Sequence, residues 1–173
     1  MAVLNPANIR AAIVAFIEGV PNTGQVHPRR RVIRTEQQLR DYLFDTANNR
    51  ICGFFVSPTT SNPAVPVRNP GHVGHGVIGG GNVITTFQFQ IEGFFGIDDA
   101  NASETVFSDL AWNVCDLFNA YGSIPASGGG AIPGIVQQQP CTIEQFGYIL
   151  FAGQFLCHYV RMDVAFTGRT RPA

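Results

Sequence analysis

His72 and His75 are three residues apart in a glycine-rich stretch, and imidazoles at that spacing could supply two ligands to a metal ion. Sequence motifs for metal binding usually bring further ligands close by, as HExxH and paired CxxC do. Neither pattern accompanies these two histidines. Polar residues of an exposed loop are therefore the favoured interpretation. The alternative from a different functional class is a metal-dependent hydrolase that uses His72 and His75.

Other residues that could do chemistry have simpler explanations. Asp98 and Asp99 stand where a helix is expected to begin, and acidic residues there stabilise the positive end of the helix. Cys157 and His158 are neighbours on an expected strand, so their side chains point to opposite faces and cannot form a direct nucleophile and base pair. The sequence places no acid beside His27 or His158, and we expect both to be half-buried and hydrogen-bonded.

The glycines do not form a phosphate-binding motif. Residues 71–76 and 79–81 are glycine-rich but lack the Gly-Lys-Ser/Thr ending of a P-loop. They also precede an expected strand, whereas a phosphate-binding loop opens a helix. We therefore assign no catalytic, cofactor-binding or metal-binding residue, and we predict that the chain is not an enzyme and uses no cofactor.

The composition is that of one globular domain. The chain has 173 residues, 45% hydrophobic content and a formal net charge of -1, which gives no overall attraction to nucleic acid. It has no apolar run of about 18 residues and no signal-peptide pattern, so we expect an intracellular protein without membrane contact. Because the four cysteines are widely spaced without a CxxC pair, we expect free thiols at Cys52, Cys115, Cys141 and Cys157.

Four arginines cluster in a chain that has no lysine. Arg29, Arg30, Arg31 and Arg34 lie in or next to an expected extended segment, residues 25–33. A solvated strand edge is the favoured interpretation of such a short basic cluster. A local contact with an anion is the alternative.

One strand and the helix that follows it organise the chain. Over residues 83–95 apolar side chains fall mostly on alternate positions, as in a half-buried antiparallel strand. Over residues 107–121 they recur three and four apart, as on one stripe of a helix. Ser103 or Asn101 can cap the first turn of this helix. We expect the two apolar faces to pack together.

The remaining elements define the fold class. A helix opens at Asn5-Pro6 and closes at Gly19, and a capping box of Thr35 and Gln38 starts a second helix that ends near residue 48. Strands are expected at 51–56, 135–139, 144–151 and 155–166. With the extended segment near residue 25, this order predicts an α+β fold in which helices pack on one face of a mostly antiparallel sheet.

Two long stretches are expected to contribute little to the core. Residues 57–82 and 122–140 are rich in glycine and proline and are predicted to be long exposed loops, and residues 167–173 a C-terminal tail. Residues 1–173 form a single domain on this interpretation. Loops of such length in a compact domain are usually functional or mobile.

The order of elements and several short motifs resemble the tail terminator proteins of tailed bacteriophages, a family that includes tail-completion proteins similar to minor tail protein U. One motif is a glycine-containing turn that runs into Val-His-x-x-x-Arg, here residues 24–31. The others are Ser-x-x-x-Phe at a helix start, Ser103 to Phe107, and Cys-His-x-x-x-x-Asp on the closing strand, Cys157 to Asp163. The likeness spans most of the chain.

This resemblance implies a structural virion protein at the junction of tail and neck, assembled in the host cytoplasm. Its copies would form a hexameric ring that caps the tail tube, stops tube polymerisation and joins the tube to the neck. The implied partners are further copies of the chain, the tail tube protein and a neck or connector protein, with DNA passing through the lumen without specific binding. A neck or head-completion protein of the same particle is the alternative.

Contacts with these partners are expected from the arginine cluster and the two loops. The candidate interaction residues are Arg29, Arg30, Arg31, Pro58, Asn69, His72, His75, Gly128, Gly129 and Gly130.

Overall fold

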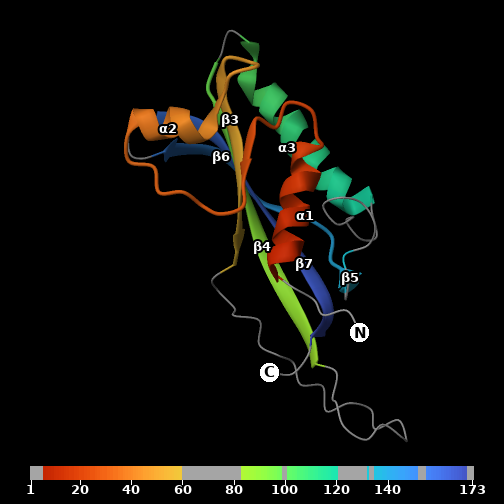
Figure 1. Ribbon diagram of the computed structural model, residues 1–173. Coiled ribbons are helices and arrows are strands. Elements are labelled where there is room, and N and C mark those ends of the chain that lie inside the picture. The colour runs from red at the N-terminus through yellow and green to blue at the C-terminus, as the bar shows by residue number, and fades with distance from the viewer. Residues whose placement is uncertain are drawn as a thin grey trace, which may run out of the picture.

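The computed structural model describes residues 6–59, 83–98, 101–120, 132, 135–151 and 155–170. These parts of the chain contain three helices and seven strands (Figure 1). In chain order the elements are α1 (Pro6–Glu18), β1 (Gln25–His27), α2 (Glu36–Leu43), β2 (Phe44–Asp45), β3 (Arg50–Pro58), β4 (Val83–Gly96), α3 (Ser103–Ala120), β5 (Ile135–Gln138), β6 (Thr142–Phe151) and β7 (Phe155–Thr170).

The sheet is built around the long antiparallel pair of β4 and β7. Its strand order is β1-β3-β4-β7-β5, β6 also pairs with β7, and the short β2 pairs with β3. Among these pairs only β1 with β3 is parallel. β5 and β6 pair with successive parts of β7, so β1 and the β5–β6 segment form the two edges of the sheet. The prediction of a mostly antiparallel α+β domain is confirmed.

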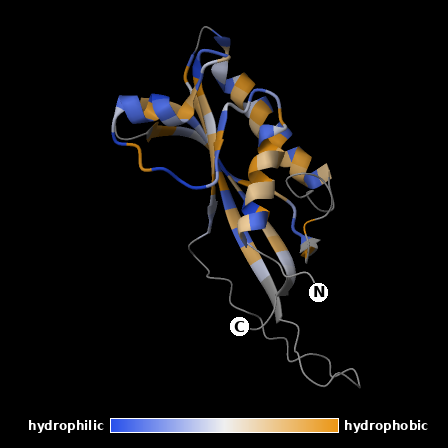
Figure 2. Cartoon of the chain, viewed as in Figure 1, coloured by the Kyte–Doolittle hydropathy of each residue, from blue (hydrophilic) through white to orange (hydrophobic). Residues whose placement is uncertain are grey.

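Helices α1 and α3 cover one face of the sheet and bury the main core (Figure 1). The apolar stripe of α1 is buried through Ile9, Ile13 and Ile17, as its spacing predicts. That of α3 is buried from Phe107 to Phe118 against the even face of β7. Fully burying a side chain of this size stabilises the fold by about 1.5–3 kcal/mol. Hydrophobic residues are accordingly denser along α1 and α3 than along α2 in Figure 2.

Helix α2 lies on the opposite face, which differs from the expectation that the helices share one face. Its buried residues Leu39 and Leu43 pack with Phe55, Phe94 and Tyr159 in a second cluster. The physical reason is that β3 is apolar in both registers, so this end of the sheet needs cover on two sides. Thr35 caps the helix as expected, since the backbone N–H of Gln38 donates to the Thr35 hydroxyl at 3.2 Å. The second bond of a capping box differs, because the Gln38 side chain accepts from the backbone N–H of Arg34, one residue before the cap, at 2.9 Å. The helix ends at residue 43, before the expected 48, because the next two residues pair with β3.

The predicted loops and tail are only partly described. β3 extends to Pro58, and residues 60–82 lie outside the described residues. The short strand expected near residue 135 is present as β5, within the predicted second loop. β7 reaches Thr170, so residues 167–170 are strand rather than tail because they pair with the long β4. None of the described helices has the length and apolar content needed to cross a membrane.

Candidate interaction surfaces

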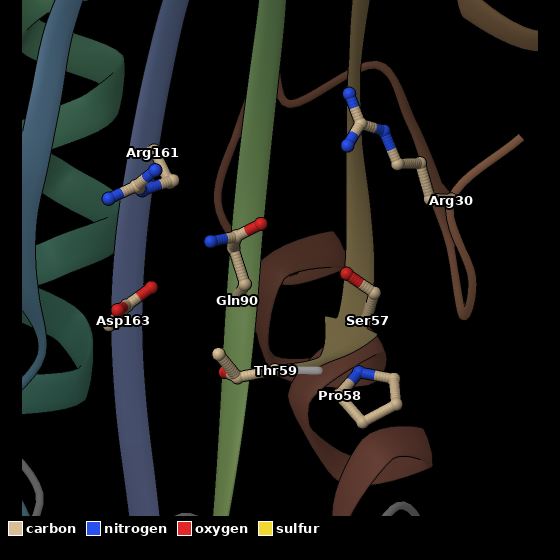
Figure 3. Close-up of a pocket in the computed structure, with 7 residues that line it drawn as sticks. All are labelled: Arg30, Ser57, Pro58, Thr59, Gln90, Arg161 and Asp163. Carbon is tan, nitrogen blue, oxygen red and sulfur yellow. The ribbon is translucent and has the colours of Figure 1, made fainter. Parts of the chain in front are cut away.

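The structure brings two of the predicted interaction residues together at one groove. Arg30 and Pro58 line a groove of about 390 Å³ on the sheet face that carries α2 (Figure 3). Arg31 lies with its guanidinium 5.2 Å from the centre of the Tyr42 ring, and Arg29 is exposed. The other predicted residues fall outside the described parts of the chain: Asn69, His72, His75, Gly128, Gly129 and Gly130.

The groove lies beside the second cluster, where polar residues of β4 and β7 stand opposite one another. Gln90 of β4 stands opposite Asp163 of β7, and Glu92 stands opposite Arg161. Because side chains alternate along a strand, these four residues share one face. The two acidic and two basic residues around the groove, counting Arg30, balance in charge. The groove therefore has no strong preference for an anion or a cation.

Glu92 is the buried anchor of this polar face. The side chain is 2% exposed, its Oε1 accepts a hydrogen bond from the Tyr159 hydroxyl at 3.0 Å, and its Oε2 lies 3.3 Å from Nε of Arg30. The pKa of the Tyr159 phenol is raised. Burial is the largest cause, and the negative charge of Glu92 and this hydrogen bond add to it. Nearby, Nε of Arg161 and Oδ1 of Asp163 are buried without a hydrogen-bond partner in the described part of the chain.

A buried serine–histidine pair lies on the other face, at the start of α3. Ser103 Oγ is 2.8 Å from His158 Nε2 and accepts a hydrogen bond from the backbone N–H of Asp98 at 2.9 Å. The two side chains are only 4% and 2% exposed. Although serine and histidine can act as nucleophile and base, this hydroxyl is enclosed and fixes the first turn of α3 on β7. The pair is therefore best explained as structural.

The expectation of half-buried, hydrogen-bonded histidines is confirmed for His27, whereas His158 is hydrogen-bonded but fully buried. His158 is buried and hydrogen-bonded to Ser103, and Nε2 of the half-buried His27 lies 2.6 Å from the carbonyl oxygen of Tyr42. Asp98 accepts a hydrogen bond from the Asn101 side chain at the entrance of α3, as expected of an acid in that position. All four cysteines are free and buried, as predicted. Within the described residues no group of three or more His, Cys, Asp or Glu side chains is placed to hold a metal ion.

The most exposed apolar row lies on the edge strand β6. We call Phe146, Tyr148, Leu150 and the paired Leu156 of β7 the β6 surface; they are 41%, 54%, 56% and 56% exposed. They share a face because they alternate along the strand and Leu150 pairs directly with Leu156. In the described part of the chain β6 pairs only with β7, which leaves its outer backbone edge open.

The β6 surface is held by contacts with α3. The Phe146 ring stacks on Phe107 with centroids 5.7 Å apart, and the Tyr148 hydroxyl donates to Glu104 at 2.9 Å. Sequence alone does not single out this row, because residues 146–151 are apolar at nearly every position. Only the place of β6 at the sheet edge reveals which of them are exposed.

The arginine cluster follows β1 and crosses the sheet face that carries α2, where Arg30 reaches Glu92 of β4 and Ile33 is buried in the second cluster. We call residues 29–34 the arginine segment; it begins two residues after β1 and has no acidic residue in it. Val32, in the middle of this segment, is 73% exposed. The sequence predicted a solvated strand edge over residues 25–33. Arg29, Arg30 and Arg34 are exposed, but the strand ends at His27 and Ile33 is buried.

Comparison with known proteins adds no relative at this point. No model of a protein family matches the chain, and no curated protein matches it.

Proposed function

We propose that the chain is a structural virion protein, a tail terminator that forms a ring on the end of a phage tail tube. The observation that carries this proposal is the β6 surface. An apolar row on a strand with an open backbone edge is a typical site of protein association, because the edge offers hydrogen bonds and the side chains offer area to bury.

The positions of the short motifs give further support. His27 of the Val-His motif lies in β1, Ser103 and Phe107 open α3, and the span from Cys157 to Asp163 lies on β7. Each motif thus falls in an element of the kind that the resemblance assigns to it. Ser103 of the helix-start motif contacts His158 of the closing-strand motif. Residues of two separate motifs therefore hold the start of α3 on β7.

On this proposal, six copies close into a ring that caps the tube, stops its polymerisation and joins it to the neck. DNA passes through the lumen without specific binding. The formal net charge of -1 suits such a lumen, since a strongly basic wall would bind the phosphate backbone and hold the DNA in place.

The test is to prevent expression of the chain in the phage whose genome encodes it and to measure tail lengths by electron microscopy. We expect tubes of irregular and excessive length that are not joined to heads. Supplying the intact chain from a plasmid should restore uniform tails. Joined tails of normal length in the absence of the chain would contradict the proposal.

The same preparation separates the terminator from a neck or head-completion protein. A terminator stays on purified tails that lack heads. A neck protein stays on capsids that lack tails, and its loss leaves free tails of normal length.

A further inference from the structure

Two of the four cysteines are neighbours in the folded chain. Cys115 of α3 and Cys141, the residue before β6, are 26 positions apart in the sequence, yet Sγ of Cys115 lies 3.3 Å from the carbonyl oxygen of Cys141. The two thiols also interact directly with each other. Each residue is only 3% exposed. This proximity is what a disulfide needs, because its geometry tolerates a narrow range of separations.

Asn119, one turn after Cys115 on α3, holds the two cysteines together. Its Oδ1 accepts a hydrogen bond from the backbone N–H of Cys141 at 2.8 Å, and its Nδ2 donates to the carbonyl oxygen of Cys141 at 3.3 Å. The same Nδ2 lies 3.7 Å from Sγ of Cys115. One side chain thus fixes both polar backbone groups of Cys141 against the helix that carries Cys115.

The other two cysteines are not placed for such a bond. Strand β4 lies between the strands that carry Cys52 and Cys157, so two strand spacings, about 10 Å, separate them. The Cα atoms of a disulfide lie within about 7 Å. Cys157 pairs with Ile149, toward the far end of β6 from Cys141. Sγ of Cys52 donates to the carbonyl oxygen of Thr23, just before β1.

We propose that Cys115 and Cys141 are the site of an intramolecular disulfide, which forms when the chain meets a small disulfide oxidant such as oxidised glutathione. The Cys115 sulfur displaces one glutathione from the oxidant, and the Cys141 sulfur then displaces the other from Cys115. Two thiols become one disulfide, one oxidised glutathione becomes two reduced molecules, and these take up the two thiol protons. Cys115 attacks first, because the Asn119 amide stabilises its thiolate.

The disulfide joins α3 to the start of β6. Farther along the strand, α3 already holds β6 through the contacts of Phe107 with Phe146 and of Glu104 with Tyr148. The new bond therefore fixes the strand that carries the β6 surface at its other end.

The environment of the chain decides when the bond forms. Burial raises the pKa of both thiols, which keeps them protonated and slows their reaction at neutral pH. In a reducing cytoplasm they stay free. This inference rests on the proposed function for its timing alone, since a virion protein leaves the cytoplasm when particles are released from the host cell.

The test is to count the thiols of the full-length protein in an oxidising glutathione buffer until the number is constant. The thiols are titrated after denaturation, and peptide mass spectrometry without reduction identifies the linked residues. We expect two of the four thiols to disappear and one linked pair of peptides, which holds Cys115 and Cys141. Cys115→Ala should form no internal disulfide, whereas the matched control Cys52→Ala should still form it. A protein that keeps all four thiols, or one linked through Cys52 or Cys157, overturns the proposed site.

Urea denaturation of the oxidised and reduced proteins tests what the bond does. Because the bond closes a loop across 26 positions, we expect the equilibrium constant for unfolding to fall about a hundredfold on oxidation. An unchanged constant would overturn the claim that the disulfide fixes α3 to β6.

Purified virions separate this inference from the proposed function. We expect the linked peptides in the chain taken from virions and free thiols in the chain taken from host cytoplasm. Free thiols in the virion overturn the timing. If the disulfide forms in the purified chain but tails keep their normal length without the chain, the disulfide site stands and the terminator role fails.

Discussion

Replacing Tyr159 by phenylalanine removes the only hydroxyl that hydrogen-bonds the buried Glu92 in the described residues. The ring stays, with its contact to Phe94 at 5.3 Å between centroids, so little packing is lost. One carboxylate oxygen loses its 3.0 Å donor, while the other keeps Arg30, whose side chain is 62% exposed. A hydrogen bond to a charged group contributes about 1.5–3 kcal/mol. We therefore expect the free energy of unfolding to fall by about 2 kcal/mol at neutral pH.

The pH dependence of this difference follows from the raised pKa of Tyr159. The folded protein holds the phenol proton more tightly than the unfolded chain, in which tyrosine ionises near pH 10. The folded state thus binds more protons above that pH, and the stabilisation from the protonated Tyr159 is lost as pH rises through the folded pKa. Tyr159→Phe lacks this ionisation, so the stability difference between the two proteins should narrow as the pH is raised above 10.

The assay is urea denaturation followed by circular dichroism, with Tyr42→Phe as the matched control. The Tyr42 hydroxyl has no hydrogen bond among the described residues, and its ring contact with Arg31 survives the change, so its effect should stay below about 0.5 kcal/mol. A double-mutant cycle of Tyr159→Phe with Glu92→Gln should show coupling. A Tyr159→Phe protein as stable as the unchanged chain, with no coupling, would refute the account of Glu92 as a buried anchor.

Three further predictions concern other parts of the chain. Ser103→Ala should lower the free energy of unfolding by about 2–4 kcal/mol in urea titrations, because a buried imidazole nitrogen and a backbone N–H lose their partner. Gly93→Ala should cost about 1–3 kcal/mol in thermal unfolding, because the new Cβ would lie 2.5 Å from a ring carbon of Phe54. Combined His72→Ala and His75→Ala should, by elemental mass spectrometry, reveal no metal lost relative to the unchanged protein.

Each of these three predictions has a control variant or a result that would contradict it. Ser108→Ala, on the same helix without a described hydrogen bond, should change stability by less than about 0.5 kcal/mol. For Gly93, a protein as stable as the unchanged chain would mean that the Phe54 ring can move aside. Stoichiometric metal that disappears with the two histidines would favour the hydrolase alternative.

Local patterns predicted most of the elements because each pattern depends on near neighbours. The stripe of α3, the alternation of β4 and the Thr35 cap of α2 are all short-range features, and the structure contains each one. The side of the sheet on which α2 packs is not such a feature. It depends on Phe55 and Phe94 meeting at one end of the second face, which the strand register sets.

The site residues were harder to predict for the same reason. Arg30 and Glu92 are far apart in the sequence, and Ser103 and His158 are 55 positions apart. The first pair can be recognised only once β1 and β4 are known to flank β3, and the second only once β7 is known to pair with β4. The β6 surface was missed because its sequence is apolar on both faces, and exposure depends on what lies beyond the strand.

The molecular mass of the purified, full-length protein in solution tests the central claim most directly, since the claim is that the chain acts through the surfaces it offers to its own copies. Sedimentation equilibrium over a range of concentrations should give a closed species of six times the 18.7 kDa of one chain. A single species of 18.7 kDa at every concentration would contradict the account.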